Sequence, residues 1–126
     1  MPVALNVPCF FLLMVLKRPV RIVFADDSLK TAFEQLCSAA YEEKELYIFI
    51  SRALNDIKEK PAGYIHIQKT RWPKEYVQKY NITNLWKYDL PNGWRLIYTI
   101  QHEDVAILCI ILEWFSHKEY ERRFGY

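Results

Sequence analysis

The sequence predicts one α+β domain, in which an N-terminal strand and two helices precede a mainly antiparallel sheet and a short C-terminal helix. Apolar residues recur at helical spacing over residues 29–57, and the pattern changes to that of strands after residue 63. Polar capping residues precede the helical part, and a Pro-Ala-Gly sequence ends it. Helices that are segregated from an antiparallel sheet define the α+β class.

The first expected element is a strand over residues 20–24, which are apolar and β-branched around Arg21. Asp26, Asp27 and Ser28 follow, and these residue types favour the N-cap of a helix. Two apolar stripes at helical spacing come next: Leu29, Ala32, Phe33, Leu36 and Ala40, then Leu46, Phe49, Ile50, Ala53, Leu54 and Ile57. We therefore expect a helical hairpin that ends before residues 61–63.

The second half of the chain is expected to form the rest of the sheet. Strands are predicted at residues 64–68, 84–90, 94–101 and 105–114, with a helical turn within residues 72–80. The run 105–114 is the most apolar, as is typical of a central strand. The charged tail, residues 117–126, is expected to be helical.

The sequence Pro-Asn-Gly at residues 91–93 predicts a three-residue hairpin loop, built as a type I turn followed by left-handed Gly93. This register places Asp89 opposite Arg95 and gives one continuous apolar face: Trp86, Tyr88, Leu90, Trp94, Leu96, Tyr98 and Ile100. The opposite face carries Lys87, Asp89 and Arg95. A two-residue loop would mix Arg95 with the aromatic side chains, so the hydrophobic pattern favours three residues.

Composition limits the functional classes. The 126 residues fit one domain, and the net charge of +2 gives no global field for nucleic acid, although residues 58–95 are basic. Cys9, Cys37 and Cys109 have no zinc-binding spacing; we expect Cys37 and Cys109 to be reduced and buried, which indicates the cytoplasm. The chain has three glycines and no glycine-rich phosphate loop, so a nucleotide-binding fold is disfavoured.

Residues 8–16 are all apolar and are followed by Lys17 and Arg18. The run is shorter than the ~20 residues of a transmembrane helix, and its flanks are not those of a signal peptide. We therefore expect no membrane partner. Residues 1–18 are expected to be an extension to a domain at 19–126, packing on that domain or on a second copy in a homodimer. The alternative is a start at Met14, with artefactual residues upstream.

Residues 85–90 (LWKYDL), the turn and residues 94–98 (WRLIY) resemble the signature hairpin of the RelE/ParE superfamily of toxins from toxin–antitoxin pairs. Members carry a strand of the Y-K-I-K-L kind followed by Y-R-L-V-Y. The tail at residues 117–120 (HKEY) is similar to the family's ending, in which a basic or His residue precedes a Tyr. The resemblance covers roughly residues 19–124 and leaves out residues 69–80.

The resemblance implies the α+β fold of this family and a ribosome-dependent mRNA endonuclease. Such toxins need no metal or cofactor, because the ribose 2′-hydroxyl attacks the adjacent phosphate. The reaction needs a group that activates the hydroxyl, a cation on the phosphate and a proton for the leaving 5′-oxygen. The implied partners are the ribosome, mRNA and a cognate protein antitoxin, whose acidic amphipathic segment is expected to cover the basic face.

The resemblance also implies roles for four residues. Arg95 matches the arginine that clamps the phosphate, and Lys87 matches the first lysine of the preceding strand. Tyr120 matches the tail tyrosine, which stacks on a base or assists proton transfer. His117 aligns with the tail His or basic residue and is a candidate acid or base. Further contacts to nucleic acid are expected from basic residues of the middle and tail: Lys58, Lys60, Lys69, Arg71 and Lys118.

Asp89 stands where the family often has a second lysine, and its carboxylate would compete with the phosphate for Arg95. Judged from the residues alone, Asp89 and Arg95 form a cross-strand ion pair. Two alternatives to the endonuclease therefore stay open. One is a ParE-like poison that binds DNA gyrase and does not need Lys87 or Arg95. The other is a non-catalytic relic of the fold that only binds an antitoxin.

Overall fold

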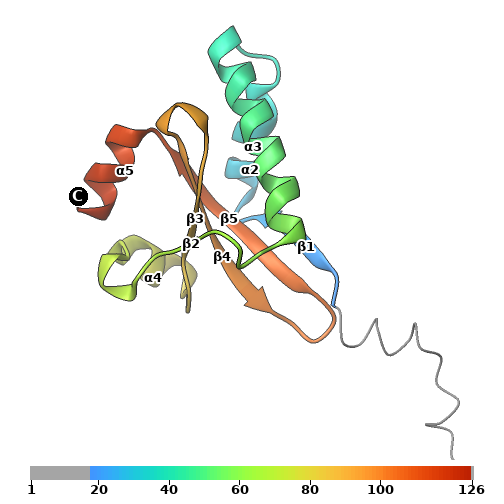
Figure 1. Ribbon diagram of the computed structural model, residues 1–126, viewed down its shortest axis with the longest axis vertical. Helices are drawn as coiled ribbons and strands as arrows, with labels where there is room; N and C mark the ends of the chain where they lie inside the picture. Colours follow the sequence, from blue (N-terminus) through green and yellow to red (C-terminus); the bar gives the residue numbers. More distant parts are fainter. Residues whose placement is uncertain (1–17, 126) are drawn as a thin grey trace, which may run out of the picture.

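Five strands form one mixed sheet in the order β1-β5-β4-β3-β2 (Figure 1). The computed structural model describes residues 18–125. Its strands are β1 (Val20–Phe24), β2 (Ile65–His66), β3 (Trp86–Asp89), β4 (Arg95–His102) and β5 (Ile107–Phe115). β1 runs parallel to β5, and the other neighbouring pairs are antiparallel. The sheet is mainly antiparallel and the helices are segregated from its strands, so the predicted α+β class is confirmed.

Within residues 18–125, four α-helices cover the two faces of this sheet (Figure 1). The predicted helical hairpin is α2 (Asp27–Leu36) and α3 (Tyr41–Glu59), and it packs on one face. The side chain of Asp26 caps α2 by accepting a hydrogen bond from Leu29 N at 2.8 Å. α4 (Lys74–Tyr80) and α5 (His117–Phe124) lie on the opposite face, and short 3₁₀ turns occupy Lys69–Arg71 and Pro91–Gly93.

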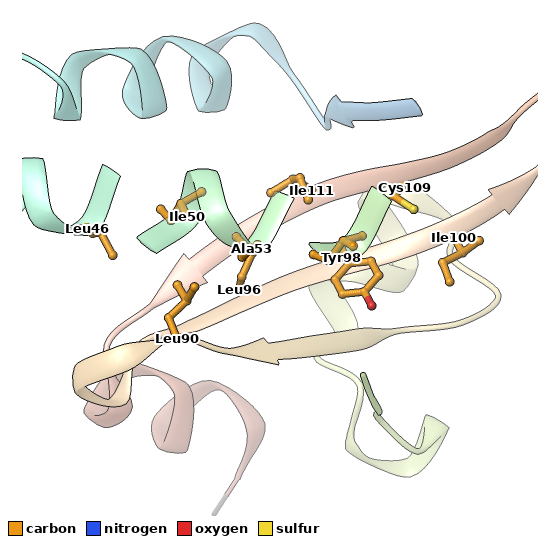
Figure 2. Close-up of a cluster of buried hydrophobic side chains, with 10 residues drawn as sticks. Leu46, Ile50, Ala53, Leu90, Leu96, Tyr98, Ile100, Cys109 and Ile111 are labelled. Carbon is orange, nitrogen blue, oxygen red and sulfur yellow. The ribbon is translucent and has the colours of Figure 1, made fainter. Parts of the chain in front are cut away.

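We call the side covered by α2 and α3 the α3 face. Its core contains the alternating apolar residues that the sequence predicts on β3 and β4, and Figure 2 shows Leu96 next to Ala53 of α3. The hydroxyl of Tyr98 reaches Pro61 O at 2.6 Å, so its one polar group is satisfied. Cys109 is also buried in this core, and burial raises the pKa of its thiol to about 11.

We call the opposite side the α5 face. A second apolar core forms there between the sheet and the helices α4 and α5: Ile67, Tyr76, Ile82, Leu85, Ile97, Leu112, Phe115, Tyr120 and Phe124. A β-bulge supports this arrangement, because Ile97 pairs with Glu113 whereas Tyr98 pairs with Ile111. The extra residue, Leu112, lies in the α5-face core, and the alternation of β5 reverses at it: Cys109 and Ile111 lie in the α3-face core before the bulge, and Trp114 packs against that core after it.

The β3–β4 turn has the predicted register, since Asp89 pairs with Arg95 and Leu90 N donates to Trp94 O at 2.8 Å. The predicted type I turn is wrong. Asn92 has φ 64°, whereas the corresponding residue of a type I turn has φ of about −90°. Asn92 and Gly93 are both left-handed. An added Cβ on Gly93 would lie 3.1 Å from the Cβ of His117, so Gly93 also permits α5 to approach the turn.

Three further predictions concern Cys37, the N-terminal extension and the membrane. Cys37 is exposed, contrary to the prediction, because α2 ends at Leu36 and leaves Cys37 on the loop that follows it. The apolar N-terminal run and its proposed role in a homodimer lie outside the described residues, as does Cys9. Arg18, which the sequence analysis assigned to the extension, contacts the domain, because its Nη1 donates a hydrogen bond to Glu103 O at 2.7 Å. None of the described helices is long and apolar enough to cross a membrane.

Candidate functional site

The four residues implied as catalytic meet at the turn end of the α5 face. Lys87 belongs to β3, Arg95 opens β4, and His117 and Tyr120 belong to the first turn of α5. Ser116 begins that helix by accepting a hydrogen bond from Glu119 N at 3.4 Å, directly after β5. Because β5 pairs Phe115 with Arg95, the start of α5 is delivered beside the cations.

Asp89 holds the two cations together. Arg95 Nε lies 2.9 Å from Asp89 Oδ1, and Lys87 Nζ lies 3.4 Å from the same oxygen. The arginine contact is an ion pair whose angle does not meet that of a hydrogen bond. The side chains of Lys87 and Arg95 are 17% and 16% exposed, so these cations are partly desolvated. The three groups carry a net charge of +1, and both cations lie against one oxygen of the Asp89 carboxylate.

Tyr120 forms the floor of this cation cluster. Its ring centroid lies 5.0 Å from Lys87 Nζ and 5.6 Å from Arg95 Cζ, within the range of cation–π attraction. The tyrosine is only 4% exposed. The ring therefore supports the two cations in this arrangement, and the implied stacking on a base would require the cations or the ring to move.

His117 lies beside Arg95 and is oriented by a carboxylate. Its Nε2 is 2.8 Å from Glu121 Oε1, and its Nδ1 is 3.4 Å from Arg95 Nη2. A proton on Nε2 satisfies the Glu121 contact, and the lone pair on Nδ1 then accepts from Arg95. The two ring nitrogens of His117 therefore face groups of opposite charge, Arg95 at Nδ1 and Glu121 at Nε2. Sequence reasoning missed Glu121, although its i,i+4 spacing from His117 on a predicted helix was a usable signal.

A hollow of about 320 Å³ adjoins the cluster. It lies between β2, the 3₁₀ turn at Lys69–Arg71 and the floor of the cation cluster, and its walls are Ile65, His66, Ile67, Gln68, Arg71, Lys87 and Tyr120. Lys87 and Tyr120 belong to both the cluster and the hollow, so the two are continuous. Sequence reasoning gave no role to His66 or Ile65, because nothing in a strand pattern indicates which edge residues border a hollow.

The basic residues expected to bind nucleic acid do not all gather here. Arg71 lines the hollow and also donates to Gly125 O at 3.3 Å. Lys58 and Lys60 lie at the end of α3, which covers the other face of the sheet. Lys69 and Lys118 are exposed, and within residues 18–125 neither lines the hollow nor contacts the cluster. Their role in binding nucleic acid stays a prediction.

The arrangement can bind an oxyanion and can place a base beside it. Arg95 offers a planar fork that suits phosphate, and Lys87 adds a point charge. Among residues 18–125 there is no group of three or more His, Cys, Asp or Glu side chains that could hold a metal ion.

A comparison of the chain with protein-family models, with curated proteins and with solved structures finds no match.

Proposed function

We propose that this protein is the toxin of a toxin–antitoxin pair and cleaves mRNA on the ribosome, as its resemblance to the RelE/ParE superfamily implies. The observation that carries the proposal is the convergence of Lys87, Arg95, His117 and Tyr120 from three separate elements on one anion site. The β3–β4 hairpin and the pairing of Phe115 with Arg95 bring the four residues together, and the partly desolvated cations among them support the binding of an anion.

In the proposed reaction the scissile phosphate replaces the Asp89 carboxylate on Arg95 and Lys87. The ribose 2′-oxygen forms a bond to phosphorus, and the bond from phosphorus to the 5′-oxygen of the next nucleotide breaks. The products are a 2′,3′-cyclic phosphate and a free 5′-hydroxyl. Arg95 and Lys87 stabilise the charge that grows on the phosphate oxygens in the transition state.

His117 takes the proton from the 2′-hydroxyl through Nδ1 in this proposal, while Glu121 keeps the other nitrogen protonated. Tyr120 is a positioning residue, because its ring lies under both cations. The leaving 5′-oxygen receives its proton from water or from a group of the ribosome.

Asp89 is the feature that sets this site apart from the family pattern. It is 44% exposed and sits at the open side of the cluster, so displacing it costs little compared with breaking a buried ion pair. The carboxylate therefore weakens phosphate binding without preventing it. A cognate antitoxin with an acidic segment would be expected to use the same cations, as Asp89 does.

The test is cleavage of a defined mRNA by the purified protein with translating ribosomes, with the new ends mapped. Arg95→Ala should lower the rate about 10²–10³-fold, the scale for losing one transition-state donor. Arg95→Lys should recover only part of it, because an ammonium lacks the planar fork. Arg52→Ala, which removes an exposed arginine on α3, is the matched control and should cleave at the wild-type rate.

Thermal melts must show that each variant is folded. A folded Arg95→Ala variant that cleaves like wild type contradicts the mechanism. If wild type cleaves no RNA but inhibits gyrase, and Arg95→Ala inhibits equally well, the ParE-like alternative is the correct one.

A further inference from the structure

We propose that a groove on the α3 face binds a short segment of a partner protein in which lysine or arginine residues alternate with large apolar ones. The groove has a volume of about 570 Å³, and its walls come from the end of α2, the first half of α3, the β3–β4 turn and the end of β5. We call it the α3-face groove. This inference goes beyond the proposed function and does not depend on it.

The floor of the α3-face groove is apolar. It consists of five large side chains, of which the first is buried and the others are only partly buried: Leu46, Leu36, Phe49, Trp94 and Trp114. Partly exposed tryptophans gathered in one hollow are typical of the surfaces at which proteins bind one another. The volume lies within the ~300–1,000 Å³ range of binding pockets, so the groove has room for a few side chains of a partner.

The two tryptophans of the groove differ from the other two tryptophans of the chain. The indole N–H groups of Trp72 and Trp86 both donate hydrogen bonds to oxygen atoms of the protein. The indole N–H groups of Trp94 and Trp114 have no acceptor within residues 18–125. A peptide segment in the groove brings backbone carbonyl groups, which can accept from these two indoles.

The rim of the groove carries three carboxylates. Glu42 and Glu43 are exposed and form no ion pair within the described part of the chain, and Glu45 Oε1 accepts a hydrogen bond from Asn92 Nδ2 at 3.3 Å. No lysine, arginine or histidine lines the groove, although the chain has 17 lysine and arginine residues. This charge favours a basic partner segment and disfavours the acidic segment expected of an antitoxin.

Glu42 and Glu43 also lie in the first turn of α3, where a negative charge stabilises the positive end of the helix dipole. That role uses their charge and leaves their carboxylate oxygens able to accept from a lysine. It does not account for the apolar floor beside them.

The groove and the cation cluster lie back to back across the sheet. Trp94 and Arg95 are consecutive, but Trp94 packs against the α3-face core, whereas Arg95 lies over the ring of Tyr120. A segment bound in the groove therefore leaves the cation cluster open.

The experiment measures binding of fluorescein-labelled peptides to the full chain by fluorescence anisotropy. The probe alternates lysine with leucine; one comparison peptide has serine in place of leucine, and another has glutamate in place of lysine. The lysine–leucine probe should bind at least about tenfold more tightly than either, because only this peptide matches both the floor and the rim. If the probe does not bind, or binds no better than the lysine–serine peptide, the proposal is wrong.

Variants of the rim locate the bound probe. Glu42→Gln combined with Glu43→Gln should weaken binding of the lysine–leucine probe about fivefold and make it less sensitive to salt. The matched control combines Glu59→Gln with Asp104→Asn, which removes two exposed carboxylates outside the groove and should change the affinity less than about twofold. An equal loss in both pairs would mean that net charge alone attracts the probe, which overturns the proposal.

A variant of the floor tests the indole donor. Trp94→Phe keeps a ring in the groove but removes its N–H, so the affinity should fall about threefold. Trp72→Phe is the matched control, because the N–H that it removes already donates to Ile67 O; it should lower the melting temperature and leave the peptide affinity unchanged. A folded Trp94→Phe variant that binds like wild type contradicts the proposed contact.

A second probe separates this inference from the proposed function. It is a fluorescein-labelled, 2′-O-methylated RNA hexamer, which cannot be cleaved and should bind at the cation cluster. Arg95→Ala should weaken hexamer binding roughly tenfold and leave peptide binding within twofold, and the Glu42 and Glu43 variant should do the reverse. If Arg95→Ala also loses the peptide, both probes share one site and the groove is wrong. If wild type does not bind the hexamer, the proposed function is weakened and the groove stands.

Discussion

The two faces of the sheet differ in the side chains that β3 and β4 place on them. On the α3 face, β3 and β4 contribute an unbroken apolar pattern, and the tyrosine hydroxyls there reach fixed partners such as Asp56 and Pro61. On the α5 face, the apolar core stops short of the β3–β4 turn, and the last positions carry Lys87, Asp89 and Arg95. The α3 face holds the strands in place, and the α5 face presents their polar ends.

The difference teaches where a small domain can accommodate desolvated cations. The α3 helix runs for 19 residues and its buried positions extend from Leu46 to Ile57. The helices of the α5 face are short, with 7 residues in α4 and 8 in α5. They leave part of that face uncovered, and the cation cluster and its hollow occupy the opening. If this division is correct, substitutions on the two faces should separate stability from function.

The largest expected effect is a loss of core packing at the adjacent residues Leu96 and Ile97, which are 0% exposed and point to opposite faces. Leu96→Ala and Ile97→Ala should each lower the free energy of unfolding by about 2–5 kcal/mol in urea titrations. Only Ile97 pairs with Lys87, so Ile97→Ala should also weaken RNA binding by the molecules that are folded, whereas Leu96→Ala should not. Equal effects of both variants on binding would break the comparison.

A smaller effect is expected at the turn that joins the two faces. Gly93→Ala should destabilise the protein by about 1–3 kcal/mol, because alanine is strained at φ 79° and its Cβ would lie 3.1 Å from His117 Cβ. Gly125→Ala is the matched control, since Gly125 has φ 73° and open space around it. Thermal melts should show the larger loss for Gly93→Ala. The same loss in both would mean that the approach of α5 to the turn does not matter.

The next effect belongs to the α3 face and depends on pH. Burial, and then the 2.6 Å hydrogen bond to Asp56, raise the pKa of Tyr88 to about 12, above the ~10 of an unfolded tyrosine. A raised folded-state pKa stabilises the fold below pH ~10, and this contribution is lost as the pH rises to about 12. Tyr88→Phe should cost about 1 kcal/mol at pH 8 and should flatten the alkaline decline in urea midpoints.

The control for that measurement is Tyr41→Phe, because Tyr41 is 78% exposed. Its alkaline decline should match that of wild type. A Tyr88→Phe variant with an unchanged decline would show that the hydroxyl does not contribute to the α3 face in this way.

The smallest effect on stability is expected at Asp89. Asp89→Asn should change the free energy of unfolding by no more than about 1 kcal/mol, because the carboxylate is 44% exposed. The same change releases Lys87 and Arg95 and should tighten RNA binding, up to about fivefold. Glu75→Gln, which removes an exposed carboxylate paired with Arg123 on the same face, should leave RNA binding unchanged. Weaker binding by Asp89→Asn would mean that Asp89 orients the cations instead of competing for them.

Periodicity was sufficient to predict most of the fold. β1 begins and ends at the predicted residues, and the alternation on β3 and β4 also gave the correct register, because one slip would have moved Arg95 onto the aromatic face. The bulge at Leu112 could not be predicted, since residues 105–112 are all apolar and do not show which side chains face which side of the sheet. The type I turn was wrong because Asn, like Gly, accepts the left-handed region.

The candidate site was predictable only in part. The order of the motifs predicted one site from four residues, and their side chains are in contact in the structure: Lys87, Arg95, His117 and Tyr120. That Arg71 borders the same site, while Lys69 does not, depends on how a 3₁₀ turn is placed on the edge of the sheet. Such placement arises from packing of Trp72, whose indole donates to Ile67 O at 2.9 Å, and not from any local pattern.

The pairing of β1 with β5 has a consequence for the order of events during synthesis. β1 is the first described strand to leave the ribosome, yet its neighbour in the sheet, β5, begins 87 positions later, with Val20 opposite Ile107. Contacts between residues so distant in the chain form slowly, because a long loop must close first. The first turn of α5 emerges later still. A nascent chain therefore has no assembled cation cluster, and the cluster forms only once those last elements are free to fold.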